Sequence, residues 1–194
     1  MSFTRPFNAR LFALVLLAAP ASALAQAQHP MGTDEQREAM KTLAWMDGEW
    51  RGTATAMTGP GQSRTMPHTE RIGTMLGGSL RVIEGRSHND DGSTLFNAFA
   101  VISWDDQADR FMMRSYANGQ ATDVPIEADG QGFKWTVTTA RGQIRYEMKL
   151  IDGQWIETGD YLMEGRPPMR VIEMKLDRIG DTGWPAAGAV SPIP

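Results

Sequence analysis

Residues 133–161 read FKWTVTTARGQIRYEMKLIDGQWIETGDY, and this stretch decides the fold class. Apolar and polar side chains alternate along 133–138 and again along 144–150, which is the period of a β-strand with one buried face. Arg141-Gly142 and Asp152-Gly153 interrupt the alternation, and Asp-Gly tolerates the two positive φ angles of a type I′ hairpin turn. The stretch therefore predicts three antiparallel strands connected by hairpins.

Turn sequences of this kind recur along the chain from Glu49 onward. They are Gly59-Pro60-Gly61, Gly77-Gly78, 89–92, 105–109, Asn118-Gly119, 129–132, Arg141-Gly142, Asp152-Gly153 and 165–168. Nine turns imply ten strands, within about residues 49–178. Since no second group of helices is available to cover a flat sheet, closure is the economical way to remove its two edges. We predict an all-β fold, an antiparallel up-and-down β-barrel, with an open sandwich as the alternative.

One short helix precedes the strands. Thr33 and Gln36 have the spacing of a capping box, and apolar residues then recur at helical intervals up to Met46. Asp47-Gly48 ends the pattern, after which the period changes to two. The sequence predicts an amphipathic helix over about residues 34–46.

The first 25 residues have the layout of a cleavable export signal. Arg5 and Arg10 precede the apolar run 11–19, and Ala23-Leu24-Ala25 places small residues where a signal peptidase needs them. The run is far shorter than the roughly 20 apolar residues that cross a bilayer, which argues against a retained membrane anchor. We therefore expect cleavage after Ala25 and a periplasmic or secreted protein.

The remaining chain has the size and charge of one acidic domain without cysteine. Removing 25 of 194 residues leaves 169, enough for a single core. The signal holds two of the 19 basic and none of the 23 acidic residues, so the balance becomes 17 minus 23, or −6, which disfavours a nucleic-acid partner. We expect a signal peptide (1–25), a leader (26–33), the helix and barrel (34–179) and a disordered tail (180–194) rich in Gly, Pro and Ala.

The junction between the helix and the first strand carries the motif Gly48-Glu49-Trp50-Arg51-Gly52. It resembles the calycin superfamily, in which lipocalins open their first strand with Gly-x-Trp and nitrobindin-like proteins open theirs with Gly-x-Trp-x-Gly after a short helix. Ten strands fit the fatty-acid-binding-protein and nitrobindin barrels better than the eight-strand lipocalins. Exported bacterial lipocalin-like families of unknown function are also similar. The resemblance implies a barrel in which Trp50 closes one end.

The resemblance does not extend to a haem or metal site. Nitrobindin-like proteins hold haem through a histidine late in the chain, whereas the histidines here are His29, His68 and His88. Three scattered histidines without cysteine also give no zinc or copper pattern. We expect no cofactor, and haem binding is the weaker alternative.

Candidate site residues are polar or aromatic groups on strand faces that would line a cavity. Arg114 and Tyr116 share a face with Met112, opposite Phe111 and Met113. If the Met112 face is internal, Arg114 offers a cation for a carboxylate or phosphate head group. The alternative is that Arg114 is a solvated charge on the outer surface.

Two acids also share a strand face with apolar neighbours. Glu84 lies on the face of Val82, and Glu157 lies on the face of Trp155 and Tyr161. Inside a barrel, either carboxylate would need an arginine or tyrosine partner, because an unpaired buried charge is costly. The alternative places them at the barrel mouth or in cross-strand pairs on the surface.

These residues support three hypotheses of function. The first is an exported binding or carrier protein for a small apolar or amphipathic ligand, with Trp50, Trp135 and Tyr146 in the cavity wall. The second is an enzyme on the same barrel, an isomerase or hydrolase that uses a buried carboxylate. The third is a structural or interaction protein with a solid barrel. No nucleophile elbow or phosphate-binding loop occurs in the sequence, so we favour binding over catalysis.

Overall fold

A computed structural model describes residues 33–140, 142–186 and 190 of the chain. The expected signal peptide and almost all of the expected leader lie outside these residues. The described chain forms one short helix followed by ten antiparallel strands, as the alternation predicts. No helix among the described residues has the length and apolar character needed to cross a membrane.

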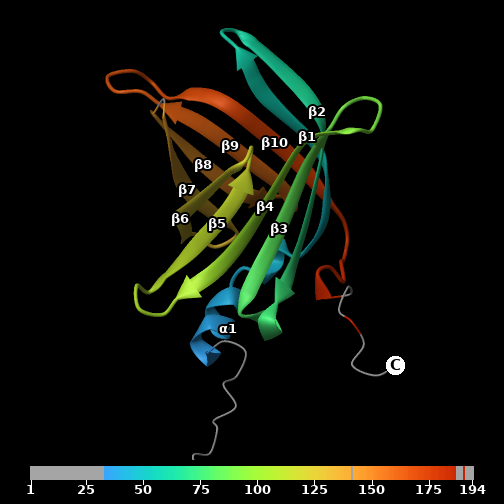
Figure 1. Ribbon diagram of the computed structural model, residues 1–194, viewed down its shortest axis with the longest axis vertical. Helices are drawn as coiled ribbons and strands as arrows, with labels where there is room; N and C mark the ends of the chain where they lie inside the picture. Colours follow the sequence, from blue (N-terminus) through green and yellow to red (C-terminus); the bar gives the residue numbers. More distant parts are fainter. Residues whose placement is uncertain (1–32, 141, 187–189, 191–194) are drawn as a thin grey trace, which may run out of the picture.

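The ten strands close into a barrel in which each strand pairs with its neighbours in the sequence and β1 pairs with β10 (Figure 1). The all-β, up-and-down barrel is therefore confirmed, and the open sandwich is wrong. The strands are β1 (Gly48–Gly59), β2 (Gln62–Met75), β3 (Leu80–His88), β4 (Thr94–Asp105), β5 (Arg110–Ala117), β6 (Gln120–Ala128), β7 (Gly132–Thr139), β8 (Gly142–Ile151), β9 (Gln154–Leu162) and β10 (Met169–Gly180).

The hairpin turns have the backbone that their sequences favour. Asn118 and Gly119 both have positive φ, 52° and 72°, and so do Asp152 and Gly153, at 52° and 79°. Positive φ at both central residues defines the type I′ turn, whose twist matches that of the flanking strands. These two turns therefore set the register of β5 against β6 and of β8 against β9.

The helix is shorter than predicted and is followed by a tighter turn. Helix α1 (Asp34–Lys41) begins at Thr33, whose hydroxyl accepts from the Gln36 amide while the Gln36 side chain accepts from the Thr33 amide. A 3₁₀ segment, η1 (Ala44–Met46), carries the chain into β1, and a second, η2 (Leu76–Gly78), connects β2 to β3. Both α1 and η1 lie at one end of the barrel (Figure 1).

This end of the barrel is closed by side chains from α1, η1 and β1. Met40, Leu43, Met46 and Trp50 are each at most 1% exposed. The indole N–H of Trp50 donates to the Met46 carbonyl at 2.9 Å, and its ring packs edge-on against Trp155 at 5.6 Å between centroids. The expectation that the first-strand indole closes the barrel is confirmed.

An ion pair between a buried arginine and a partly exposed aspartate lies beneath the same end. Arg81 of β3 is 2% exposed, and its guanidinium donates to both carboxylate oxygens of Asp47, at 2.6 and 2.8 Å, and to the Met40 carbonyl. The carboxylate and the carbonyl together accept hydrogen bonds from all three nitrogen atoms of the buried guanidinium group. The pair therefore fastens the helical segment to the barrel.

The described part of the expected disordered tail packs on the outside of the barrel. The ring of Trp184 lies edge-on to Phe99 of β4 at 6.4 Å and beneath the Arg71 guanidinium at 4.4 Å. Gly73 makes room for it, since a Cβ there would lie 1.9 Å from the Trp184 carbonyl oxygen. Val82, the cross-strand partner of Gly73, is buried although its side chain faces outward. Disorder therefore does not describe the start of this segment.

Candidate functional site

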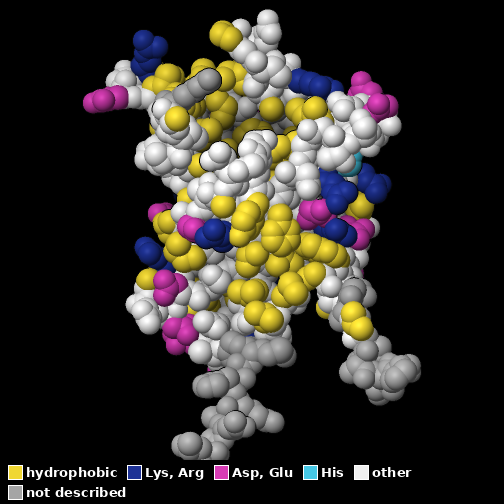
Figure 2. Space-filling model, viewed as in Figure 1, with side chains coloured by type: hydrophobic (Ala, Val, Ile, Leu, Met, Phe, Trp, Pro, Cys, Tyr) yellow, Lys and Arg dark blue, Asp and Glu magenta, His cyan; other side chains and the backbone are white. Residues whose placement is uncertain are grey.

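The inner face of the barrel changes character along its length. Near α1 it is solid, because inward residues such as Ile102, Phe133, Met148 and Leu176 are at most 3% exposed. Toward the other end the inward side chains remain only partly buried: Phe96, Ala98, Trp135, Val137, Ile144, Tyr146, Tyr161 and Ile172. Partial exposure on the inside of a closed barrel marks a cavity that opens to solvent. Figure 2 shows a hollow with hydrophobic walls at the end opposite α1.

A row of three buried polar side chains, joined by hydrogen bonds, lies at the side of this cavity. His68 and Glu70 point inward from β2 and meet Ser87 of β3. His68 Nδ1 lies 2.8 Å from Ser87 Oγ, and its Nε2 lies 3.0 Å from Glu70 Oε1. Gly85 leaves room for the carboxylate, since a Cβ there would lie 2.5 Å from Glu70 Oε1. The arrangement connects a hydroxyl, an imidazole and a carboxylate in one hydrogen-bonded row.

One oxygen of this row has no partner. Glu70 Oε2 is buried and accepts no hydrogen bond from any described residue. The Glu70 side chain is only 10% exposed, so solvent satisfies it poorly. A buried acceptor without a donor costs about 1–3 kcal/mol, and more when it is charged. The oxygen is therefore a site that a donor on a ligand would stabilise.

A second carboxylate, Glu157, enters the cavity from β9. Its Oε2 accepts from the Trp155 indole N–H at 3.2 Å. Burial raises the pKa of Glu157 to about 8, and the nearby negative charge of Glu70 contributes in the same direction. Glu157 therefore holds its proton at neutral pH, when the cavity contains no compensating charge.

Aromatic side chains form the wall beside Glu157. Trp135 of β7 stacks on Tyr146 of β8, with centroids 4.8 Å apart and planes 8° from parallel. Gly159 of β9 permits this, because a Cβ there would lie 2.9 Å from the Tyr146 ring. Burial, followed by the charge of Glu157, raises the pKa of the Tyr146 hydroxyl. The wall is thus an uncharged aromatic surface next to two acids.

Five of the residues predicted for the site lie on the inner face: Trp50, Trp135, Tyr146, Glu157 and Tyr161. Trp50 belongs to the closed end, and the other four lie around the cavity. Their role in binding a ligand stays a prediction.

The other three predicted residues lie on the outer surface. Phe111 and Met113 of β5 are buried inside, so the Met112 face is external and Arg114 is a solvated charge. Arg114 donates to Tyr116 at 2.8 Å and to Asp123 at 2.7 Å. The prediction of Arg114 and Tyr116 as polar anchors inside the cavity is therefore wrong. The surface alternative is correct.

Glu84 is also external, as its cross-strand alternative predicted. Its carboxylate accepts from Arg71 and from Arg86, and it lines an outer-surface pocket with them. Burial opposes ionisation, but these two guanidinium groups outweigh it and lower the pKa of Glu84. Glu84 is therefore a paired surface carboxylate, outside the cavity.

Sequence reasoning missed His68, Glu70 and Ser87. The pattern Met66-x-His68-x-Glu70-x-Ile72 gives a signal for two of them, because it places both polar residues on one face between buried apolar ones. Ser87 belongs to another strand, 19 residues after His68, and only the register of β2 against β3 brings it close.

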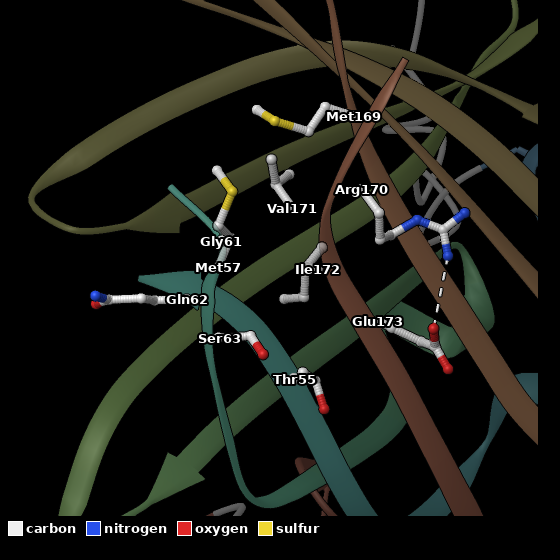
Figure 3. Close-up of a pocket in the computed structure, with 10 residues that line it drawn as sticks. All are labelled: Thr55, Met57, Gly61, Gln62, Ser63, Met169, Arg170, Val171, Ile172 and Glu173. Carbon is white, nitrogen blue, oxygen red and sulfur yellow. Dashed lines mark ion pairs between the residues drawn. The ribbon is translucent and has the colours of Figure 1, made fainter. Parts of the chain in front are cut away.

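A second hollow lies at the open rim, where the pairing of β1 with β10 ends at Ala56 and Ile172. Its volume is about 380 Å³. Its lining comes from the β1–β2 hairpin and the start of β10 (Figure 3): Thr55, Met57, Gly61, Gln62, Ser63, Met169, Arg170, Val171, Ile172 and Glu173. Ile172 also faces the interior against Gly159, so this second hollow adjoins the mouth of the cavity.

Comparison with known proteins supports the fold alone. No protein-family model matches the sequence, and no curated protein matches it. Among solved structures, Rv2717c from M. tuberculosis is similar, with a TM-score of 0.55 and 10% identity over 76% of this chain and 99% of that one. The chain is thus a closed ten-strand antiparallel barrel with a solved structural neighbour, consistent with a calycin-like barrel.

Proposed function

We propose that the protein binds a small amphipathic molecule in the barrel cavity and acts outside the cytoplasm as a binding or carrier protein. The observation that carries this proposal is the partly exposed inner face, where aromatic and aliphatic side chains surround a buried polar row. Ligand cavities combine an apolar wall with a few placed polar groups in the same way. A solid structural barrel would have buried these inner side chains completely.

The shape of the cavity suits a molecule with one apolar and one polar end. The apolar wall near the mouth includes Phe96, Val137 and Ile144, whereas the unpartnered Glu70 oxygen and Glu157 lie deeper. A ligand that entered polar end first would place its hydrogen-bonding group against these acids and its apolar part along the wall. Burial of that apolar part contributes roughly 25 cal/mol per Å².

Native mass spectrometry and a fluorescent-lipid titration of the mature protein test the proposal. We expect a 1:1 complex and quenching of tryptophan fluorescence from Trp135 and Trp155. The substitution Ala98→Trp fills the cavity from β4 and should abolish binding, with Tyr116→Ala on the outer surface as the control. Equal binding by a folded Ala98→Trp variant would refute a ligand site in the cavity.

The row of Ser87, His68 and Glu70 favours hydrolysis as a second candidate function. A hydroxyl on an imidazole that a carboxylate orients is the arrangement that activates a serine nucleophile. Ser87 is 4% exposed, so a substrate would reach it only through the cavity. Hydrolysis of short-chain p-nitrophenyl esters tests it, and the activity should be lost in Ser87→Ala and kept in Tyr116→Ala. Wild-type protein without esterase activity, or activity that survives Ser87→Ala, would refute this role.

A further inference from the structure

Resting on the proposed cavity function, we infer that the polar end of the ligand is cationic, a protonated amine. The evidence comes from the charges on the inner face of the barrel, the unpartnered oxygen and the aromatic wall.

The charged side chains that line the cavity are acidic. Within the described strands, the carboxylates on the inner face are Glu70 and Glu157. The lysine and arginine side chains at inward positions are Arg81, Arg178 and Arg64, and none of them lies in the cavity. Arg81 is held by Asp47 below the closed end, Arg178 binds the Asp47 carbonyl at that end, and Arg64 donates to Asn89 at the rim. His68 lies beside the cavity, but its Nε2 is already engaged by Glu70 Oε1. A ligand deep in the cavity therefore meets two acids and no lysine or arginine.

The unpartnered oxygen of Glu70 needs a hydrogen-bond donor. His68 occupies Oε1, and Gly85 replaces a side chain that would otherwise crowd the carboxylate. An ammonium N–H would supply both the missing hydrogen bond and a positive charge, and charge-assisted bonds of this kind are about twice as strong as neutral ones. An anionic head group would leave Oε2 unpartnered and would face the charge of Glu70.

The aromatic wall provides the remaining contact surface for a cation. The partly exposed rings of Trp135 and Tyr146 lie beside Glu157, whereas the buried Trp155 contributes only its indole N–H to that carboxyl group. The negative face of an aromatic ring attracts ammonium groups by about 0.5–2 kcal/mol, most strongly for tryptophan. Carboxylates beside such rings are the combination that recognises ammonium ligands.

Three ligands with the same decyl chain test the inference: decylammonium, decan-1-ol and decanoate. Each is titrated calorimetrically below its aggregation concentration at about pH 7.5. We expect decylammonium to bind at least about tenfold more tightly than the other two. Decanoate or decanol binding as tightly as decylammonium would overturn the cationic head group and leave the cavity function intact. Absence of 1:1 binding by all three would overturn both.

Matched variants locate the preference within the cavity. Glu70→Gln should lower decylammonium affinity about tenfold or more and leave decanol affinity unchanged, because it removes charge at constant size. Glu147→Gln is the control, since Glu147 lies on the outer face of β8 beside Lys149. An unchanged preference in Glu70→Gln, or an equal loss in Glu147→Gln, would overturn the assignment.

The pH dependence of ligand affinity distinguishes direct contact with Glu157 from a purely structural role of this residue. The groups that surround Glu157 are Glu70, Trp155 and Tyr146. A bound cation favours ionised Glu157, so decylammonium, which stays protonated over this range, should bind up to about tenfold more tightly per pH unit between about pH 6 and 8. This increase should disappear in Glu157→Gln. A wild-type affinity that is independent of pH would overturn the contact with Glu157.

Discussion

Replacing Glu157 by glutamine should stabilise the protein at neutral pH. Glutamine has nearly the same shape, and its amide oxygen can still accept the hydrogen bond that Trp155 donates to Glu157 at 3.2 Å. The substitution therefore removes the ability to ionise while it keeps the packing. The difference in unfolding free energy between the two proteins isolates the titration of this one carboxyl.

The magnitude follows from the pKa of Glu157, which burial and Glu70 raise from 4.5 in the unfolded chain to about 8 in the fold. Because the folded state holds the proton more tightly, wild type loses stability relative to the variant as pH rises above 4.5, until about pH 8. Each unit of pKa difference corresponds to about 1.4 kcal/mol. The variant should equal wild type near pH 4.5, exceed it by about 3 kcal/mol at pH 7 and reach about 5 kcal/mol above pH 8.

Urea unfolding followed by tryptophan fluorescence at several pH values measures this difference. The control is Glu147→Gln on the outer face of β8, where the hydrogen bond from Lys149 is the largest effect and lowers the pKa of Glu147. Since that carboxylate is partly exposed, its removal should change the unfolding free energy by less than about 1 kcal/mol, in the destabilising direction. A Glu157→Gln difference that is the same at about pH 5 and pH 8 would refute the reasoning.

Three further substitutions test separate parts of the structure. Arg81→Met leaves the partly exposed Asp47 carboxylate and the Met40 carbonyl without their buried donor and should lower the unfolding free energy by about 1–3 kcal/mol in a urea titration. Gly85→Ala forces the Glu70 carboxylate to move and should cost about 1–3 kcal/mol, with a shifted imidazole signal of its histidine partner by NMR. Arg114→Ala should change stability by less than about 1 kcal/mol and leave ligand affinity unchanged, because this ion pair is exposed.

The sequence predicts the barrel well because its determinants are local. Alternation along 133–138 and 144–150 sets the inner and outer faces of β7 and β8, and Asp152-Gly153 sets the hairpin that follows. The capping box at Thr33 is equally local and correctly marks the start of α1. Each feature depends on residues within one element, so no distant contact is needed to recognise it.

The orientation of β5 could not be predicted, because both of its faces carry apolar residues. Phe111 and Met113 face inward, where Phe111 packs on Trp104 at 4.8 Å. Tyr116 faces outward, where it contacts Phe99 at 6.4 Å. Phe99 in turn contacts Trp184 from the end of the chain, so an apolar cluster forms on the outer surface too. Only the register of β4, β5 and the tail decides between the two orientations.

The polar groups of the cavity are costly to the fold, and that cost is an argument for their function. An apolar residue in place of Glu157 would avoid the loss of several kcal/mol that its raised pKa implies at neutral pH. A bound cation would restore part of that loss by lowering the pKa of Glu157, since linkage requires ligand and ionisation to favour each other. Glu157→Gln should therefore raise stability and lower affinity for an ammonium ligand together. A purely structural carboxyl would change stability alone, so the opposite response of the two measurements distinguishes a binding group from a tolerated one.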